Sequence, residues 1–194
     1  MPTGVAIPDA RALLFDAAER ILLRDGGNML TSRAVTTEAG VAKGVLHRHF
    51  EDFDTFLAEL VLDRVGRMQA VADDLMARAG TGPVVDQLAA ALDNLLGPIA
   101  VAIVGLVISR DGLRAALRAR GSARIPVLGE ATAVVARYLA AEQAVGRISP
   151  ATDVDALAPI LVGAVHMQLA EGAPVEPEAL TRTVTAVVGG LVSA

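Results

Sequence analysis

The polar residues best placed to do chemistry lie between Thr31 and Phe50, a stretch that holds the chain's only Lys and two of its three His. Their cationic and hydroxyl groups can donate hydrogen bonds to phosphate oxygens, and Arg can also pair with the edge of guanine. The spacing predicts two short helices joined by a tight turn at Gly40, with Leu46 and Phe50 facing inward because they lie four residues apart. The outer surface of the second helix then carries Lys43, Gly44, Val45, His47 and Arg48. A helix-turn-helix places such a surface in the major groove of DNA.

Signatures of metal sites and enzymes are weak by comparison. His47 and His49 are two residues apart, so on a helix their rings point about 200° away from each other and cannot chelate one ion. The chain has no Cys, and the metal-binding pattern HExxH is absent. It also lacks the glycine-rich phosphate loops and the G-x-S-x-G nucleophile motif. We therefore expect no metal, no cofactor and no catalytic residue.

The composition indicates a folded protein with an aliphatic core. Hydrophobic residues make up 53% of the 194 residues and aromatic residues only 3%, which excludes a disordered chain. The net charge of −5 argues at first against a nucleic-acid partner. However, residues 1–50 hold six basic and five acidic side chains, whereas residues 51–194 hold 11 and 17. A weakly basic N-terminal part therefore precedes an acidic remainder.

Apolar residues recur at steps of three and four almost throughout, which predicts an all-α fold of about nine helices. Helices over about 10–25, 32–40 and 43–50 would form a helix-turn-helix head. A long helix over about 53–79 then leads into a larger C-terminal bundle.

The longest apolar stretch, Leu95–Ile108, has 14 residues, and a membrane span needs about 20. This stretch therefore predicts a buried helix. Because residues 1–8 also lack the features of a signal peptide, we expect a cytoplasmic protein.

The stretch from Thr31 to Phe50 resembles the DNA-binding domain of the TetR family of transcriptional regulators. The matching positions are Thr31, Val35, Ala39-Gly40-Val41, Lys43-Gly44, Leu46 and His49-Phe50. The long helix that follows stands where the family has the helix linking its two domains. The resemblance implies a DNA-binding domain over residues 1–51 and an effector-binding and dimerisation domain over residues 52–194.

The resemblance also implies a role for each residue of the motif. Contacts to phosphate, which give affinity but no sequence information, would come from Thr31, Arg33, Lys43, His47 and His49. Arg48 would contact guanine and Val45 a thymine methyl group, while Gly44 would let the helix lie close to DNA. The alternative for each charged residue is an ordinary solvated side chain.

Four positions depart from the family pattern. Thr36 stands where a small Ala is usual, and Ala42 where a Ser commonly caps the recognition helix, a cap that stabilises a helix by about 1 kcal/mol. His47 replaces a Tyr whose hydroxyl contacts phosphate in the family. Phe53 stands where a Lys often approaches the DNA backbone. These departures bear on phosphate affinity more than on the fold.

The C-terminal part holds a few polar residues in aliphatic surroundings. The candidates for effector contacts are Gln87, Asn94, Tyr138, His166 and Gln168. Each could equally be a core residue whose polar group is satisfied by a neighbouring carbonyl. Because aliphatic side chains dominate this region, we expect a lipophilic, largely uncharged effector. Arg110 and Arg137 leave an anionic effector as the alternative.

The last two predicted helices cover about 153–170 and 176–191. In the first, apolar residues extend over more than one stripe of the helix surface, and in the second they form a single stripe. Ile160 belongs to the first of these surfaces. The residues predicted at a dimer interface are Leu161, Val165, Leu180, Val184, Val187 and Leu191. The family resemblance implies a two-fold symmetric homodimer with two helices from each subunit.

These observations lead to three hypotheses about function. The first is a ligand-responsive repressor that binds a pseudo-palindromic DNA operator and is released by the effector. The second is a helical small-molecule binding protein that has lost DNA binding, for which Phe53 and His47 argue. The third, based on a mean hydropathy of +0.50, is a membrane-associated helical protein.

Overall fold

The computed structural model describes residues 9–122, 125–171 and 177–192. Within these ranges the chain forms ten α-helices and two 3₁₀ turns, and its only β-type pairing is an isolated bridge between Ile148 and Val192. The all-α fold is therefore confirmed, with ten helices where about nine were expected.

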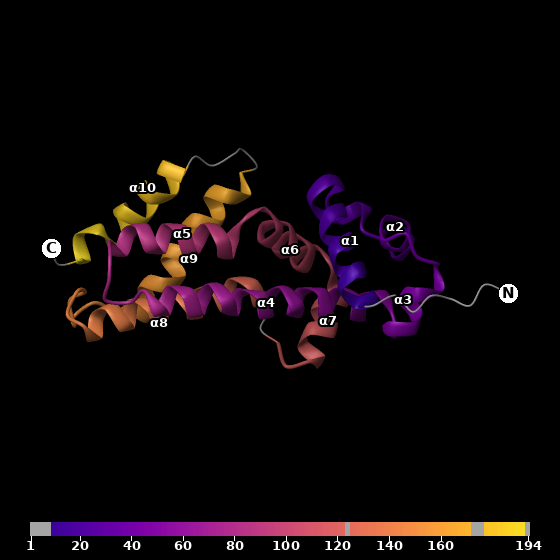
Figure 1. The fold of residues 1–194 in the computed structure, drawn as a ribbon, viewed down its shortest axis with the longest axis horizontal. Helices are drawn as coiled ribbons and strands as arrows, with labels where there is room; N and C mark the ends of the chain where they lie inside the picture. Colours follow the sequence, from indigo (N-terminus) through magenta and orange to yellow (C-terminus); the bar gives the residue numbers. More distant parts are fainter. Residues whose placement is uncertain (1–8, 123–124, 172–176, 193–194) are drawn as a thin grey trace.

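The three N-terminal helices are α1 (Ala10–Asp25), α2 (Ser32–Glu38) and α3 (Gly44–His49), with the 3₁₀ turn η1 (Gly27–Met29) after the first. The others are α4 (Phe53–Ala77), α5 (Val84–Leu96), α6 (Pro98–Ser109), α7 (Asp111–Ala119), α8 (Pro126–Ala144), α9 (Val154–Ala170) and α10 (Pro177–Val188), followed by η2 (Gly189–Leu191). We call α1–α3 the head and α4–α10 the body. Figure 1 shows the head at one end of an elongated molecule.

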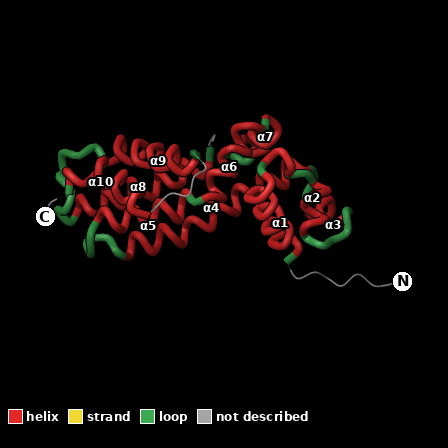
Figure 2. Tube along the Cα trace, turned by 90° about the horizontal axis from the view of Figure 1, so that it is seen from above, coloured by secondary structure: helices red, strands yellow, loops and turns green. Residues whose placement is uncertain are grey.

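Helix α4 connects the head to the body. It has 25 residues, and its body half packs against α5 and α8. Helix α9 packs mainly on α8, and α10 on α5, so the body is a layered bundle around α5 and α8 (Figures 1 and 2). Helices α6 and α7 lie where the body meets the head, since α6 contacts α1 and α7 contacts α4.

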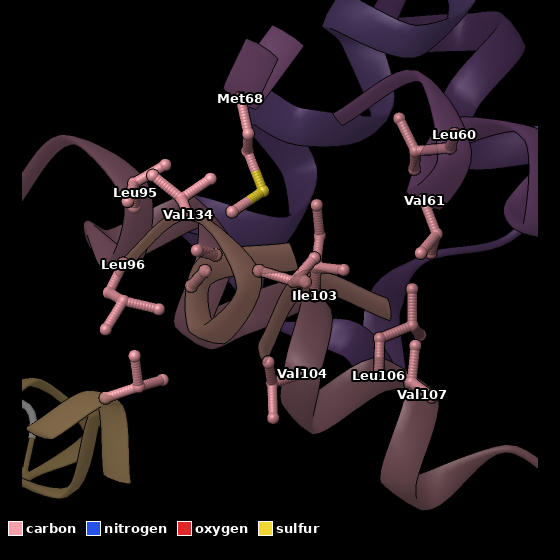
Figure 3. Close-up of a cluster of buried hydrophobic side chains, with 14 of the residues drawn as sticks. Leu60, Val61, Met68, Leu95, Leu96, Ile103, Val104, Leu106, Val107 and Val134 are labelled. Carbon is pink, nitrogen blue, oxygen red and sulfur yellow. The ribbon is translucent and has the colours of Figure 1, made fainter. Parts of the chain in front are cut away.

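The core of the body is aliphatic. Figure 3 shows side chains from α4, α5, α6 and α8 meeting there, among them Met68, Leu95, Ile103 and Val134. No single helix in the described ranges is both long and apolar enough to cross a membrane. Helices α5 and α6 reach the required length and composition only together, and they are bent by 51° at their junction. Both helices bury most of their larger apolar side chains in this core, as the sequence predicts for Leu95–Ile108, although Ile108 itself is 58% exposed.

All four phenylalanines of the chain gather where the head meets α4. The rings of Phe15 from α1, Phe50 at the end of α3 and Phe56 from α4 have centroids 5.0 to 5.8 Å apart. Phe53 stacks on Phe56 at 5.5 Å. Such ring pairs stabilise a structure by about 0.5–1.5 kcal/mol each beyond the burial of their area. The head is therefore attached to α4 through aromatic contacts.

Side-chain caps fix where several helices begin. Oxygens of Asp9, Thr31, Asp52 and Asp153 each accept a hydrogen bond from a backbone N–H in the first turn of the next helix. Such a cap satisfies one of the N–H groups that a helix leaves without an internal partner. Thr31 and Ser32 could each cap α2 by residue type, and the structure has Thr31 as the cap, whose hydroxyl accepts from the N–H of Ala34 at 3.1 Å.

Helix α3 begins without a side-chain cap. Lys43 already has helical backbone angles, so the capping position is held by Ala42, whose carbonyl accepts from the N–H of Val45 at 2.9 Å. Ala offers no side-chain acceptor, and the first-turn N–H groups of α3 gain none. This six-residue helix is held instead by the buried side chains of Leu46 and Phe50.

A buried polar cluster joins the turn between α4 and α5 to the end of α8. The side chain of Glu142 is fully buried, its Oε1 accepts from the N–H of Gly80 at 3.1 Å, and its Oε2 lies 3.3 Å from Nη1 of Arg147. One turn earlier on α8, the hydroxyl of Tyr138 donates to Oε1 of Gln87 at 2.9 Å. Burial raises the pKa of this hydroxyl. A buried carboxylate is tolerated here because an N–H group and a guanidinium compensate its charge.

The missing cap predicts that Ala42→Ser stabilises the protein by about 1 kcal/mol, because a Ser hydroxyl can accept from a first-turn N–H of α3. The free energy of unfolding in urea would measure the change. Ala42→Val is the control, since it adds no acceptor and Val is as poor an N-cap residue as Ala. A Ser variant no more stable than the wild type would mean that Ala42 is not the capping position.

The buried cluster predicts that Glu142→Ala destabilises the protein by about 2 kcal/mol, because the Gly80 N–H and the partly buried Arg147 both lose their partner. Glu142→Gln should cost less, since an amide oxygen can still accept from Gly80. The matched control is Glu130→Ala on the same helix, whose carboxylate lies 3.8 Å from the half-exposed Arg137. Denaturation curves in which Glu130→Ala and Glu142→Ala cost the same would contradict the prediction.

Candidate nucleic-acid interface

The helix-turn-helix is built from α2, a tight turn and α3. Gly40 has a φ of +66°, a left-handed conformation that favours glycine, and its N–H donates to the carbonyl of Thr37 at 3.1 Å. Val35 from α2 is buried, and so is Leu46 from α3, as the sequence predicts for Leu46. The hydroxyl of Thr36 is also buried and donates to the carbonyls of Ser32 and Arg33, so the larger residue fits at this position.

Most of the predicted DNA contacts are exposed on the head. This holds for Thr31, Arg33, Lys43, Gly44, His47, Arg48 and His49. A Cβ added at Gly44 would meet nothing within 4 Å, so the surface beside it is open. In the described part of the chain, Arg33, Lys43 and Arg48 have no ion-pair partner, unlike most other arginines. These three cations are therefore available to an external anion.

The position of Val45 differs from the prediction. It is only 8% exposed and belongs to the core, so the expectation that it lies on the outer surface is wrong. The physical reason is that α3 has only six residues, too few for one row of apolar side chains to anchor it. It therefore buries the adjacent Val45 and Leu46 together with Phe50. Val45 cannot reach a thymine methyl group from this position. Arg48 remains as the candidate for base contact.

Two ion pairs fix α2 against α1. Oε1 of Glu38 lies 2.9 Å from Nε of Arg20, and its Oε2 lies 3.1 Å from Nη2 of Arg24. Hydrogen bonds from Arg20 and Arg24 lower the pKa of Glu38. Beside this contact, a groove of about 620 Å³ runs between the end of α1 and α2, and both Thr31 and Arg33 line it. The two predicted phosphate contacts of α2 thus share one concave surface.

The predicted effector residues do not converge on one place. Gln87 and Tyr138 are hydrogen-bonded to each other, whereas Asn94 is exposed and donates to the carbonyl of Ala90 at 2.8 Å. Gln87 and Asn94 line a cavity of about 120 Å³ between α4 and α5. Ligand sites usually have about 300–1,000 Å³, so a drug-sized molecule would need this cavity to widen.

The other two effector candidates lie on α9. Oε1 of Gln168 accepts from the Thr183 hydroxyl at 2.9 Å, which joins α9 to α10. His166 is half-buried, and its Nδ1 has no hydrogen-bond partner among the described residues. Burial lowers the pKa of His166, because desolvation disfavours the charged imidazolium. The side-chain oxygen of the half-buried Gln168 is therefore satisfied within the chain, whereas His166 keeps an unused polar atom.

The predicted dimer residues require a second correction. Leu161, Val165, Leu180 and Val184 are buried within the single chain, because α9 packs on α8 and α10 packs on α5. Val187 and Leu191 are half-buried. A side chain already enclosed by its own chain cannot form a seam with another copy. The apolar periodicity in these helices reports the core of the body.

The exposed apolar face of α9 lies elsewhere, and the prediction missed most of it. It consists of residues at alternating steps of four and three, Ala156, Ile160, Gly163, Met167 and Ala170. Ile160 and Met167 are 60% and 66% exposed. The 4-3 spacing is visible in the sequence, but the neighbouring core stripe hides it. Glu142 was also missed, because an isolated Glu on a helix resembles a solvated residue.

Within the described ranges, no group of three or more His, Cys, Asp or Glu side chains could hold a metal ion.

Comparisons with known proteins agree with this architecture. Residues 14–60 match the family described as bacterial regulatory proteins, tetR family. No curated protein sequence matches the chain. The crystal structure of reduced E. coli NemR aligns over 96% of this chain and 98% of its own, with 16% identity and a TM-score of 0.72.

Two further crystal structures are similar. A member of the TetR family from Streptomyces coelicolor A3 aligns over 93% of this chain and 98% of its own, with 24% identity and a TM-score of 0.65. A gamma-butyrolactone receptor, described as ArpA-like, aligns over 95% and 88%, with 22% identity and a TM-score of 0.60. At these identities the structures show a shared fold. Residues 14–60 thus match the tetR family of bacterial regulatory proteins, and the chain as a whole shares the fold of these structures.

Proposed function

We propose that this chain is a homodimeric repressor of transcription that a small lipophilic effector releases from its operator. In this proposal, residues 1–51 bind DNA and residues 52–194 bind the effector and form the dimer. The protein is not an enzyme, and it acts in the cytoplasm.

The observation that carries the proposal is the set of free cations on an anchored helix-turn-helix. Lys43 and Arg48 are exposed at α3 and Arg33 at α2, without internal partners in the described ranges. Two other arginines of the head, Arg20 and Arg24, are already held by Glu38. Phosphate affinity depends on the local field, so a net charge of −5 does not prevent binding of DNA at this surface.

A second copy of the chain supplies the second head. The exposed 4-3 stripe on α9 is the kind of seam along which two helices pack, and Gly163 at its centre permits close approach. A two-fold dimer presents two equal heads, which fits a pseudo-palindromic operator with half-sites about 34–36 Å apart or multiples of it.

The effector site lies in the aliphatic body. Gln87 and Tyr138, with Asn94 beside them, offer the few polar groups that would orient a ligand, and His166 offers an unpaired nitrogen. One protein of similar fold is described as a gamma-butyrolactone receptor. A lactone is small and uncharged, as we propose for the effector of this chain. An effector that binds one arrangement of the two heads better than the other weakens DNA binding through linkage.

The test is selection of DNA from a random duplex library, followed by affinity measurements on the selected duplex. Arg48→Ala should relax base preference at one position of each half-site, where about 1–3 kcal/mol of discrimination against the wrong base would be lost. Lys43→Ala should weaken binding to all duplexes and reduce the slope of log K against log salt by about one per head. Arg137→Ala, an exposed arginine on α8, is the control.

Two outcomes would contradict the proposal. If no duplex is enriched, the chain does not recognise DNA, and the small-molecule binding protein becomes the better description. If duplexes are enriched but both Arg48→Ala and Lys43→Ala bind as the wild type does, then α3 is not the recognition helix.

The proposed seam predicts that Ile160→Glu and Met167→Glu convert the dimer to a monomer at micromolar concentration, because each places a charge in an apolar interface. Light scattering coupled to size exclusion would measure the mass. Val145→Glu is the matched control, since Val145 is 59% exposed and lies on the loop after α8. Dimeric Ile160→Glu and Met167→Glu variants would show that the seam is elsewhere.

A further inference from the structure

One arginine of the body reaches the base of the head. Arg110 lies between α6 and α7, and its Nε is 2.6 Å from Oδ1 of Asp54 in the first turn of α4. Its guanidinium also lies over the ring of Phe53, 5.1 Å from the centroid. Arg110 therefore makes an ion pair and a cation–π contact at adjacent residues, both on the segment that follows α3.

From Phe53 a continuous line of rings leads to the recognition helix. Phe53 stacks on Phe56 at 5.5 Å, and Phe56 meets Phe50 edge-on at 5.0 Å. Phe50 ends α3, where its N–H donates to the carbonyl of Leu46 at 3.0 Å. The position of Phe50 thus depends on Phe56, and that of Phe56 on the ring that Arg110 covers.

At the Phe50 end of this line of rings, a second cation makes a cation–π contact. Arg11 of α1 lies over the ring of Phe50 at 4.8 Å and pairs with Glu59 of α4. Glu59 in turn lies 3.7 Å from Arg120, at the end of α7. The two ends of α7 therefore hold two acidic residues of α4 that lie five positions apart.

A glycine makes the first of these contacts possible. A Cβ built on Gly112, in the first turn of α7, would lie 2.1 Å from Oδ2 of Asp54. The carboxylate of Asp54 occupies the space of that missing side chain, beside the N-terminus of α7, where a negative charge is stabilised. Asp54 is thus fixed by Arg110 and by the end of a body helix together.

We infer that Arg110 is a positioning residue for DNA binding, which sets the recognition helix through Phe53, Phe56 and Phe50. This inference rests on the proposed function. The reason lies in α3 itself, which has six residues and no side-chain cap. So short a helix does not hold its own orientation in water, and its packing has to supply it. Phe50 supplies part of this packing. Arg110, which lies outside the head, contacts Phe53, and Phe53 reaches Phe50 through Phe56.

The test compares Arg110→Ala with Arg110→Lys and Arg118→Ala on the duplex selected from the random library. Arg110→Ala should weaken binding roughly three- to tenfold, as expected for a cation–π contact and a partly exposed ion pair. The salt slope should stay unchanged, because Arg110 does not touch phosphate in this role. Arg110→Lys, which keeps the charge but not the planar group, should restore part of the affinity. Arg118→Ala should bind as the wild type does, since Arg118 is exposed on α7 and has no partner in the described ranges.

A variant of the ring tests the route. Phe53→Leu keeps apolar volume but removes the π face, so it should weaken binding as Arg110→Ala does. The double variant should be no weaker than Arg110→Ala alone, because both changes break the same contact. Losses that multiply would show that Arg110 acts on DNA binding by another path.

Three results would overturn the inference: unchanged affinity in Arg110→Ala, no recovery in Arg110→Lys, or a salt slope reduced by about one, which marks a direct phosphate contact. Hydrogen exchange without DNA separates this inference from the proposed function. Amides of residues 44–50 should exchange faster in Arg110→Ala than in Arg118→Ala. If the wild type binds no duplex, the proposed function fails, and equal exchange in the two variants would refute the positioning role as well.

Discussion

The burial of Phe50 is the contact on which the DNA-facing end of the molecule depends. Its ring packs against Phe15 and Phe56, and so ties α3 to both α1 and α4. Helix α3 has no cap and six residues, so its own hydrogen bonds do not hold it. Without Phe50 the exposed cations of α3 would have no fixed geometry, and a fixed geometry is what distinguishes base reading from attraction to any polyanion.

The two ends of the molecule use different kinds of core. The head is held by aromatic rings, whose contacts have preferred geometries, whereas the body is filled with Val, Leu, Ile and Ala, whose packing has no preferred direction. An aliphatic core can repack around a guest, which is consistent with the effector site we propose. The polar cluster around Glu142 adds a fixed point in this body, because it holds the turn after α4 against α8.

In the part of the chain that the structure describes, most arginines are held in ion pairs. Many arginines are paired with acids of their own chain, among them Arg24, Arg67 and Arg110. Lys43 and Arg48 have no such partner in the described ranges. The net charge of −5 is a sum over the whole chain and does not give the electric field at the head. A phosphate at α3 meets a field set mainly by the few unpaired cations there.

The sequence by itself determined the helices, their ends and the helix-turn-helix, because these depend on spacings of three and four residues and on local caps such as Thr31. The tertiary structure decided which way the apolar faces point. Val45 and Leu161 have the periodicity of surface and seam residues, yet both are buried, because the neighbours that enclose them come from distant parts of the chain. For the same reason only the fold could bring Arg110 to Phe53 across 57 positions of sequence. A local pattern shows that a face is apolar, but what covers that face is a non-local property.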